Sequence, residues 1–187
     1  QSGKLDCYQR IISPGSSCGI ASSSGSKQIF LVANSKYDRD EWAKIRNLST
    51  LKDIYVELET ERHDSPVMTS LLNVTAGDQV NISLLPLRSE VRLNSIRCDF
   101  SNEAYYNEIL TDVKIYLTNV NANCSLVTNE QSSSSRFINT GMLDTGYLNQ
   151  FTEQGMIAQN LDIDIGRTTT QIQRSLYCYA NQPIEES

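Results

Sequence analysis

The chain has 187 residues, of which 39% are hydrophobic, and this allows one large domain or two small ones around a packed core. A formal net charge of −6 argues against a nucleic-acid partner, because no basic face is present to displace phosphate counterions. No apolar run approaches the roughly 18 residues that span a bilayer, so we expect a soluble chain. The start at Gln1, without a signal-peptide pattern, indicates a processed or trimmed product.

The first part of the chain is expected to hold a strand and a short capped helix. Residues 13–26 are rich in Ser and Gly and predict a long loop. The apolar run at residues 28–33 indicates a strand that is buried on both faces. Asp38 and Glu41 have the spacing of a capping box, which predicts a short helix after Asp38. Ser49 is a second N-cap candidate, before a brief turn.

A join between two domains is predicted at about residue 78. Alternating residues at 54–58 predict a half-exposed strand, and a further apolar segment follows at 67–74. The segment leads into Ala76, Gly77 and Asp78, where Gly77 can adopt the positive φ of a tight turn. We therefore expect an N-terminal domain at 1–78 and a C-terminal domain at 79–187.

Three alternating patterns follow one another between residues 80 and 121. Each has apolar residues on one face and polar residues on the other, as a half-buried strand requires. The apolar positions are Val80, Ile82 and Leu84, then Val91 and Leu93, then Val113, Ile115 and Leu117. This region makes a sheet-built protein the favoured fold class.

The last part of the chain has weaker patterns. Residues 130–136 predict a solvated loop, and 137–148 an irregular segment that packs on the sheet. Met156 and Ile157 suggest a short helix, residues 161–165 alternate as a strand would, and residues 176–179 predict a final strand. The chain then stops on an acidic loop, so either further strands follow or a sheet edge must be covered by something else.

Five cysteines stand at Cys7, Cys18, Cys98, Cys124 and Cys178, without a CxxC pair. With His63 as the single histidine, a zinc site is not expected. At most two intrachain disulfides can form, and buried thiols are an equally good interpretation.

No catalytic residue, metal ligand or cofactor site is predicted. His63 beside Asp64 is a pattern that an oriented catalytic base can have, but no nucleophile motif supports that interpretation, and a surface histidine explains the pattern better. Asp162 and Asp164 can share a strand face and bind calcium. The simpler interpretation is that they are polar residues that point outward from a solvated strand. We do not expect an enzyme.

Tyr105, Tyr106 and Tyr147 lie in loop-like segments and are candidates for surface contacts. Exposed aromatic rings can stack on sugars or on a host protein. Packing at a sheet edge is the competing interpretation for each of them.

Several runs of the sequence resemble fimbrial subunits of Bacteroides-type bacteria, in the fimbrillin superfamily of major, anchor and tip pilins. They are LRSEVRLNSIRCDFSNEAYYNEILTDVKIYLTNVNANC, FINTGMLD and LYCYANQPIEES, with ANSKYDRDEW and SPVMTSLLNVTAGDQVNISLLPL upstream. The resemblance covers roughly residues 28–187. It implies an all-β fold of two transthyretin-like or Greek-key β-sandwich domains with one or two short helices. Under this interpretation the N-terminal domain can be incomplete and the C-terminal domain can be truncated.

The same resemblance implies a function in surface fimbriae. It predicts a structural and adhesive subunit, exported as a lipid-anchored precursor to the outer membrane and cell surface. Its partners would be other fimbrial subunits, by strand exchange, and a host glycan or protein. An open sheet edge can accept an extended strand, and we expect that edge in a sheet bounded by the N-terminal or C-terminal strand. The alternative is a glycan-binding β-sandwich domain of an outer-membrane lipoprotein.

Overall fold

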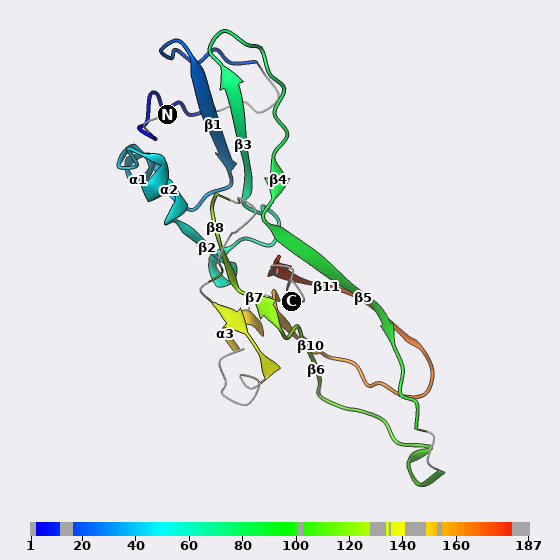
Figure 1. Cartoon of the computed structure of the whole chain (residues 1–187). Coiled ribbons are helices and arrows are strands. Elements are labelled where there is room, and N and C mark those ends of the chain that lie inside the picture. The colour runs from blue at the N-terminus through cyan, green and yellow to red at the C-terminus, as the bar shows by residue number, and fades with distance from the viewer. Residues whose placement is uncertain are drawn as a thin grey trace, which may run out of the picture.

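The computed structural model describes residues 3–11, 17–100, 103–127, 134, 136–140, 149–152 and 155–180. Within these ranges strands predominate, and the helices are single turns or little more. The strands form several small antiparallel sheets along an elongated body (Figure 1). The prediction of an all-β protein with short helices is therefore confirmed at the level of the fold class.

The first sheet joins β1 (Ser26–Ala33), β3 (Met68–Thr75) and the very short β4 (Leu85–Pro86). β1 and β3 pair along their whole length, from Ser26↔Thr75 to Ala33↔Met68. β1 is the strand predicted at 28–33, but most of its residues are half-buried and Gln28 is exposed, so burial on both faces is wrong. Gly77, just beyond β3, has a φ of +102°, as the predicted turn requires.

The predicted capping box begins α1 (Arg39–Ala43). Asp38 Oδ1 accepts hydrogen bonds from the backbone of Asp40 (2.8 Å) and Glu41 (2.9 Å), and Glu41 Oε2 accepts one from Asp38 N (2.7 Å). The bonds satisfy backbone donors that a helix start leaves free.

The prediction of an N-cap at Ser49 is wrong, because α2 (Leu48–Lys52) begins two residues earlier. Its N-cap is Asn47, whose Oδ1 accepts a hydrogen bond from Thr50 N at 2.8 Å. Ser49 lies inside the helix, and its hydroxyl donates to the same Asn47 oxygen.

A two-stranded sheet connects the two halves of the sequence. β2 (Tyr55–Glu57) pairs with β8 (Asn123–Ser125). The strand predicted at 54–58 is shorter than expected, because Leu58 begins the 3-10 turn η1 (Leu58–Thr60) and is fully buried there.

The longest ladder joins β5 (Arg88–Ile96) to β11 (Thr170–Tyr179), with register from Arg88↔Tyr179 to Ile96↔Thr170. β7 (Val120–Asn121) meets β11 at Tyr179, and β9 (Phe137–Ile138) pairs with β7. β6 (Val113–Tyr116) pairs with β10 (Ala158–Leu161) in a separate sheet. The predicted strands around residues 91–93, 113–117 and 176–179 are therefore confirmed.

Three other predicted elements are wrong. Residues 80–84 form no strand, although Ile82 and Leu84 are half-buried between exposed neighbours. Met156 and Ile157 form a fully buried bend before β10 rather than a helix, and α3 (Asn149–Thr152) comes before them. The strand expected at 161–165 ends at Leu161, and Ile163 is exposed.

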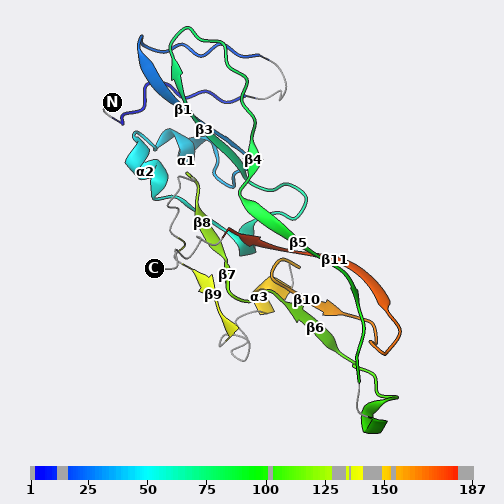
Figure 2. The same ribbon diagram turned by 45° about the vertical axis from the view of Figure 1, so that its right-hand side comes forward.

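Two apolar clusters stabilise the elongated body. The larger one packs buried residues from before and after residue 78, such as Leu58, Val67, Ile138 and Ile157. The smaller one packs Cys98, Leu161, Ile165 and Ile172 between the β5–β11 and β6–β10 ladders. We call the part around the smaller cluster the arm, and it extends away from the β1–β3–β4 sheet in both ribbon views (Figures 1 and 2). The division into domains at residue 78 stays a prediction.

All five cysteines are free thiols. Cys98 and Cys124 are buried, Cys178 is half-buried, and Cys7 and Cys18 are exposed.

Candidate functional site

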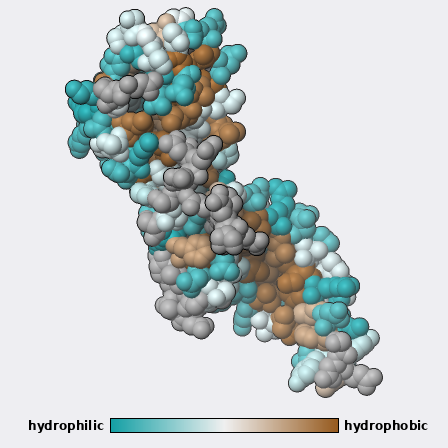
Figure 3. Space-filling view, viewed as in Figure 1, coloured by the Kyte–Doolittle hydropathy of each residue, from teal (hydrophilic) through white to brown (hydrophobic). Residues whose placement is uncertain are grey.

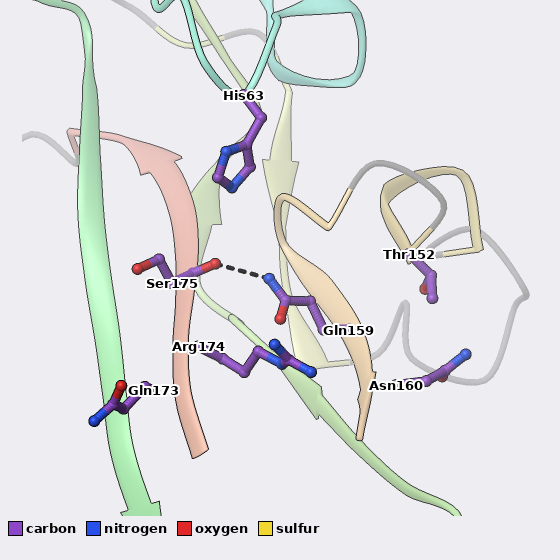
Figure 4. Close-up of a pocket in the computed structure, with 7 residues that line it drawn as sticks. All are labelled: His63, Thr152, Gln159, Asn160, Gln173, Arg174 and Ser175. Carbon is purple, nitrogen blue, oxygen red and sulfur yellow. Dashed lines mark hydrogen bonds between the residues drawn. The ribbon is translucent and has the colours of Figure 1, made fainter. Parts of the chain in front are cut away.

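A depression of the described surface lies between β10 and β11, and we call it the β10–β11 groove. Its wider end has a volume of about 460 Å³ and is lined by His63, Thr152, Gln159, Asn160, Gln173, Arg174 and Ser175 (Figure 4). A second depression of about 170 Å³ lies further along the same two strands, between Leu161–Ile163 and Gln171–Arg174.

The groove arises because the start of β10 lies beside the end of β11 and the two strands then separate. At the closed end, Tyr177 N donates a backbone hydrogen bond to Met156 O at 2.9 Å. Two residues further, the strands no longer meet directly. Instead, the side chain of Gln159 spans the gap and Nε2 donates to Ser175 O at 2.7 Å (Figure 4). The same Nε2 lies 2.8 Å from Gly155 O, which holds the amide in place.

A bulge in β11 lies at the wider part of the groove. The β5–β11 register shifts between Gln171 and Arg174, and Gln173 has a φ of +50°. A β-bulge inserts an extra residue, bends its strand and redirects the neighbouring side chains. Arg174, next to the bulge, extends across the space between the two strands (Figure 4).

Both strands present edges to the groove that lack a ladder partner among the described residues. β10 pairs with β6 on its far side, and β11 pairs with β5 on its far side and reaches β7 at Tyr179 alone. Leu161 and Ile172, which belong to the smaller apolar cluster, line the second depression. Figure 3 shows apolar surface on the arm, on the side turned toward the viewer. The groove therefore combines two strand edges that lack a ladder partner among the described residues with apolar side chains at its narrower end, while the side chains that line its wider end are polar.

The mouth of the groove is built by a loop from the N-terminal half. The His63 ring packs edge-on against the Tyr177 ring, with centroids 4.9 Å apart. The guanidinium carbon of Arg88 lies 4.2 Å from the Tyr177 centroid, and its nitrogens donate to the carbonyls of Arg62 (3.1 Å) and His63. Aromatic and cation–π contacts of this kind fix the loop against β5 and β11.

A buried carboxylate anchors this loop from below. Glu61 is 6% exposed, and its two oxygens accept hydrogen bonds from Val67 N (2.6 Å) and from the Tyr179 hydroxyl (2.8 Å). Burial raises the pKa of the Tyr179 phenol far above its usual value, and the charge of Glu61 raises it further. The phenol therefore stays protonated and donates to the carboxylate over the ordinary pH range.

The structure does not assemble a catalytic dyad around His63. Asp64 contacts Arg62 and Ser65 rather than the imidazole. Ser175 lines the same groove as His63, but its hydroxyl donates to Glu90. That hydrogen bond, followed by the one from Arg92, holds the pKa of Glu90 below its usual value. His63 is an exposed part of the groove mouth.

Asp162 and Asp164 lie beyond the end of β10, where both are exposed. Within the described ranges, no three His, Cys, Asp or Glu side chains gather as metal ligands.

Tyr105 and Tyr106 lie far from the groove, at the end of the arm, and are 57% and 51% exposed. The third candidate, Tyr147, lies outside the described residues.

Local patterns in the sequence did not reveal the groove. Gln159 and Asn160 are the two polar residues of the short strand β10. They line a groove only because the fold places β11 beside them. The one sequence signal near the groove was the alternation of apolar and acidic residues at 161–165, which begins where β10 ends.

Compared with protein-family models, with curated proteins and with solved structures, the chain matches none of them. In the part of the chain with described coordinates, no helix is long and apolar enough to cross a membrane.

Proposed function

We propose that this chain is a structural and adhesive subunit of bacterial surface fimbriae, which assembles when an extended strand of another subunit fills the β10–β11 groove. The observation that carries the proposal is the pair of facing strand edges that lack a ladder partner among the described residues, with the apolar Leu161 and Ile172 at the narrower end of the groove. An inserted strand gains backbone hydrogen bonds on both sides, and its alternate side chains bury apolar surface.

Comparison with the outer edge of the arm supports this choice of site. The outer edge of the arm is β5, which carries the charged residues Arg88, Glu90 and Arg92. Charged residues on an edge strand oppose pairing with another chain. In the groove, by contrast, the Gln159 amide occupies a hydrogen-bonding position that the backbone of an incoming strand can take over.

The sequence resemblance to fimbrillins supports the biological setting. In this proposal the chain is exported as a lipid-anchored precursor, and it acts at the outer membrane and cell surface. It adopts the transthyretin-like two-domain architecture of that superfamily, with other subunits as its partners.

The proposal is tested by site-specific photo-crosslinking between copies of the purified chain. A photoreactive residue at Asn160, which is exposed in the groove, should give covalent oligomers whose yield rises with protein concentration. The matched control places the same residue at Lys52, which is exposed on α2. Equal yields from both positions, or monomer alone from Asn160 at every concentration, would contradict strand insertion in this groove.

A further inference from the structure

The end of the arm carries a second exposed cluster that the assembly site does not use. It follows η2 (Glu103–Tyr105), where Tyr105, Tyr106, Ile109 and Leu110 are 57%, 51%, 53% and 46% exposed. Single exposed apolar residues are common on protein surfaces, but a contiguous group of large ones marks an interaction site. We call this group, together with Arg167, the distal cluster.

The backbone under the distal cluster is held by several hydrogen bonds. Glu108 N donates to Tyr105 O at 3.0 Å, which closes the turn. Leu110 and Ile165 exchange both backbone hydrogen bonds, at 2.9 and 3.0 Å. Gly166 O in turn accepts from Cys98 N at 2.8 Å. The exposed side chains are thus presented on a fixed support, and fixing a site before binding lowers the entropic cost of binding.

An arginine is stacked on one of the two tyrosines. The guanidinium carbon of Arg167 lies 3.6 Å from the centroid of the Tyr106 ring. The guanidinium lies over one face of the ring, holds the orientation of the ring and places its hydrogen-bond donors beside that face. An oriented aromatic ring beside polar groups is the combination that holds a small ligand by its apolar face and by its hydroxyls.

Size and charge identify the kind of ligand. A stable protein–protein interface takes roughly 20–30 residues a side, far more than this narrow end of the arm presents. Around the cluster lie exposed carboxylates, which disfavour an anionic ligand and can accept hydrogen bonds from hydroxyl groups. They are Glu108 and Asp112, which lie within or directly after the segment 105–110, and Asp164, which precedes Ile165, the bridge partner of Leu110. We propose that the distal cluster binds a neutral glycan, with Tyr105 and Tyr106 as stacking platforms and Arg167 and the carboxylates as hydroxyl partners.

The full chain, displayed on a tetrameric carrier, is applied to an array of neutral and sialylated glycans. We expect saturable binding to neutral glycans, and we expect the Tyr105→Ala and Tyr106→Ala variants to weaken it about fivefold to tenfold each. Tyr105→Phe, which keeps the ring, should stay within about threefold of the parent chain. The matched control is Tyr8→Ala, which removes a tyrosine of similar exposure (45%) near the N-terminus. Unfolding curves establish that each variant is folded.

Three results would overturn the proposal. The first is that the folded chain does not bind neutral glycans, and the second is that it binds sialylated glycans alone. The third is that the Tyr105→Ala/Tyr106→Ala double variant binds neutral glycans as well as the parent chain does. None of them bears on the β10–β11 groove, whose crosslinking assay uses different residues.

Discussion

The buried pair of Glu61 and Tyr179 shows how single residues fix the groove. A carboxylate that loses water on burial must be hydrogen-bonded, and here the backbone of Val67 and the Tyr179 phenol supply the bonds. The pair connects the loop that carries His63 to the last residue of β11, although 118 positions separate the two partners in the sequence.

Replacing Tyr179 with Phe should therefore destabilise the protein. The variant keeps the ring but leaves one oxygen of Glu61 without its donor, which costs about 1–3 kcal/mol of unfolding free energy. Urea denaturation measures the effect. Tyr177→Phe is the matched control, since its ring contacts with His63 and Arg88 do not need the hydroxyl, and we expect a change below about 0.5 kcal/mol. Equal losses in both variants would show that the Glu61 contact is not the cause.

Because the thiol of Cys124 is buried, we expect the free energy of unfolding to depend on pH in the alkaline range. Burial raises its pKa to about 12 from an ordinary value of 9.0, with the charges of Glu61 and Glu57 as smaller causes. The folded state thus holds this proton more tightly than the unfolded state. The corresponding stability is fully present below pH 9 and is lost as the pH rises toward 12.

The same environment protects Cys124 from alkylation. At pH 8 we expect iodoacetamide to modify the exposed Cys7 and Cys18 in the native chain, and Cys124 only after urea is added. Peptide mass spectrometry at successive times follows each site. Rapid native modification of Cys124 would contradict the burial seen here.

At the scale of elements, the sequence predicted local features well and long-range ones poorly. The Asp38 capping box and the strands around Val91 and Val113 depend on neighbouring residues, so their patterns were sufficient. Residues 80–84 alternate as a strand does, but alternation reports which face is covered and not whether a partner strand is present. The groove depends on where β10 and β11 separate, which no local pattern encodes.

Glycine substitution tests whether β11 contains the bulge at Gln173. Gln173 has a φ of +50°, a left-handed conformation that costs roughly 1–2 kcal/mol for a residue other than glycine. Gln173→Gly should therefore stabilise the chain by about 0.5–1 kcal/mol in urea denaturation. Gln171→Gly, two positions earlier in the same strand and equally exposed, should destabilise it by a similar amount. Destabilisation by both substitutions would argue against the bulge.

At the scale of the whole molecule, the two apolar clusters divide the stability of the chain. Leu58 is fully buried in the larger cluster and Ile165 in the smaller one. The arm has fewer buried residues, so it is expected to open locally more readily than the rest.

Cavity-forming substitutions test this division by hydrogen exchange. Ile165→Ala should cost about 2–5 kcal/mol and speed amide exchange mainly in β6, β10 and the N-terminal half of β11. Leu58→Ala has a similar direct cost, but it should speed exchange in β2, β8 and the region around Ile138. Uniform acceleration over the chain in both variants would indicate a single cooperative unit.

The length of the β5–β11 ladder has a mechanical consequence. The two strands run antiparallel along the long axis of the arm, from Arg88↔Tyr179 to Ile96↔Thr170. Tension applied along that axis pulls the strands past each other, and their hydrogen bonds, which lie perpendicular to the strands, share the load and must fail together. A pull across the arm would instead break them one after another. The molecule is therefore built to resist traction in one direction.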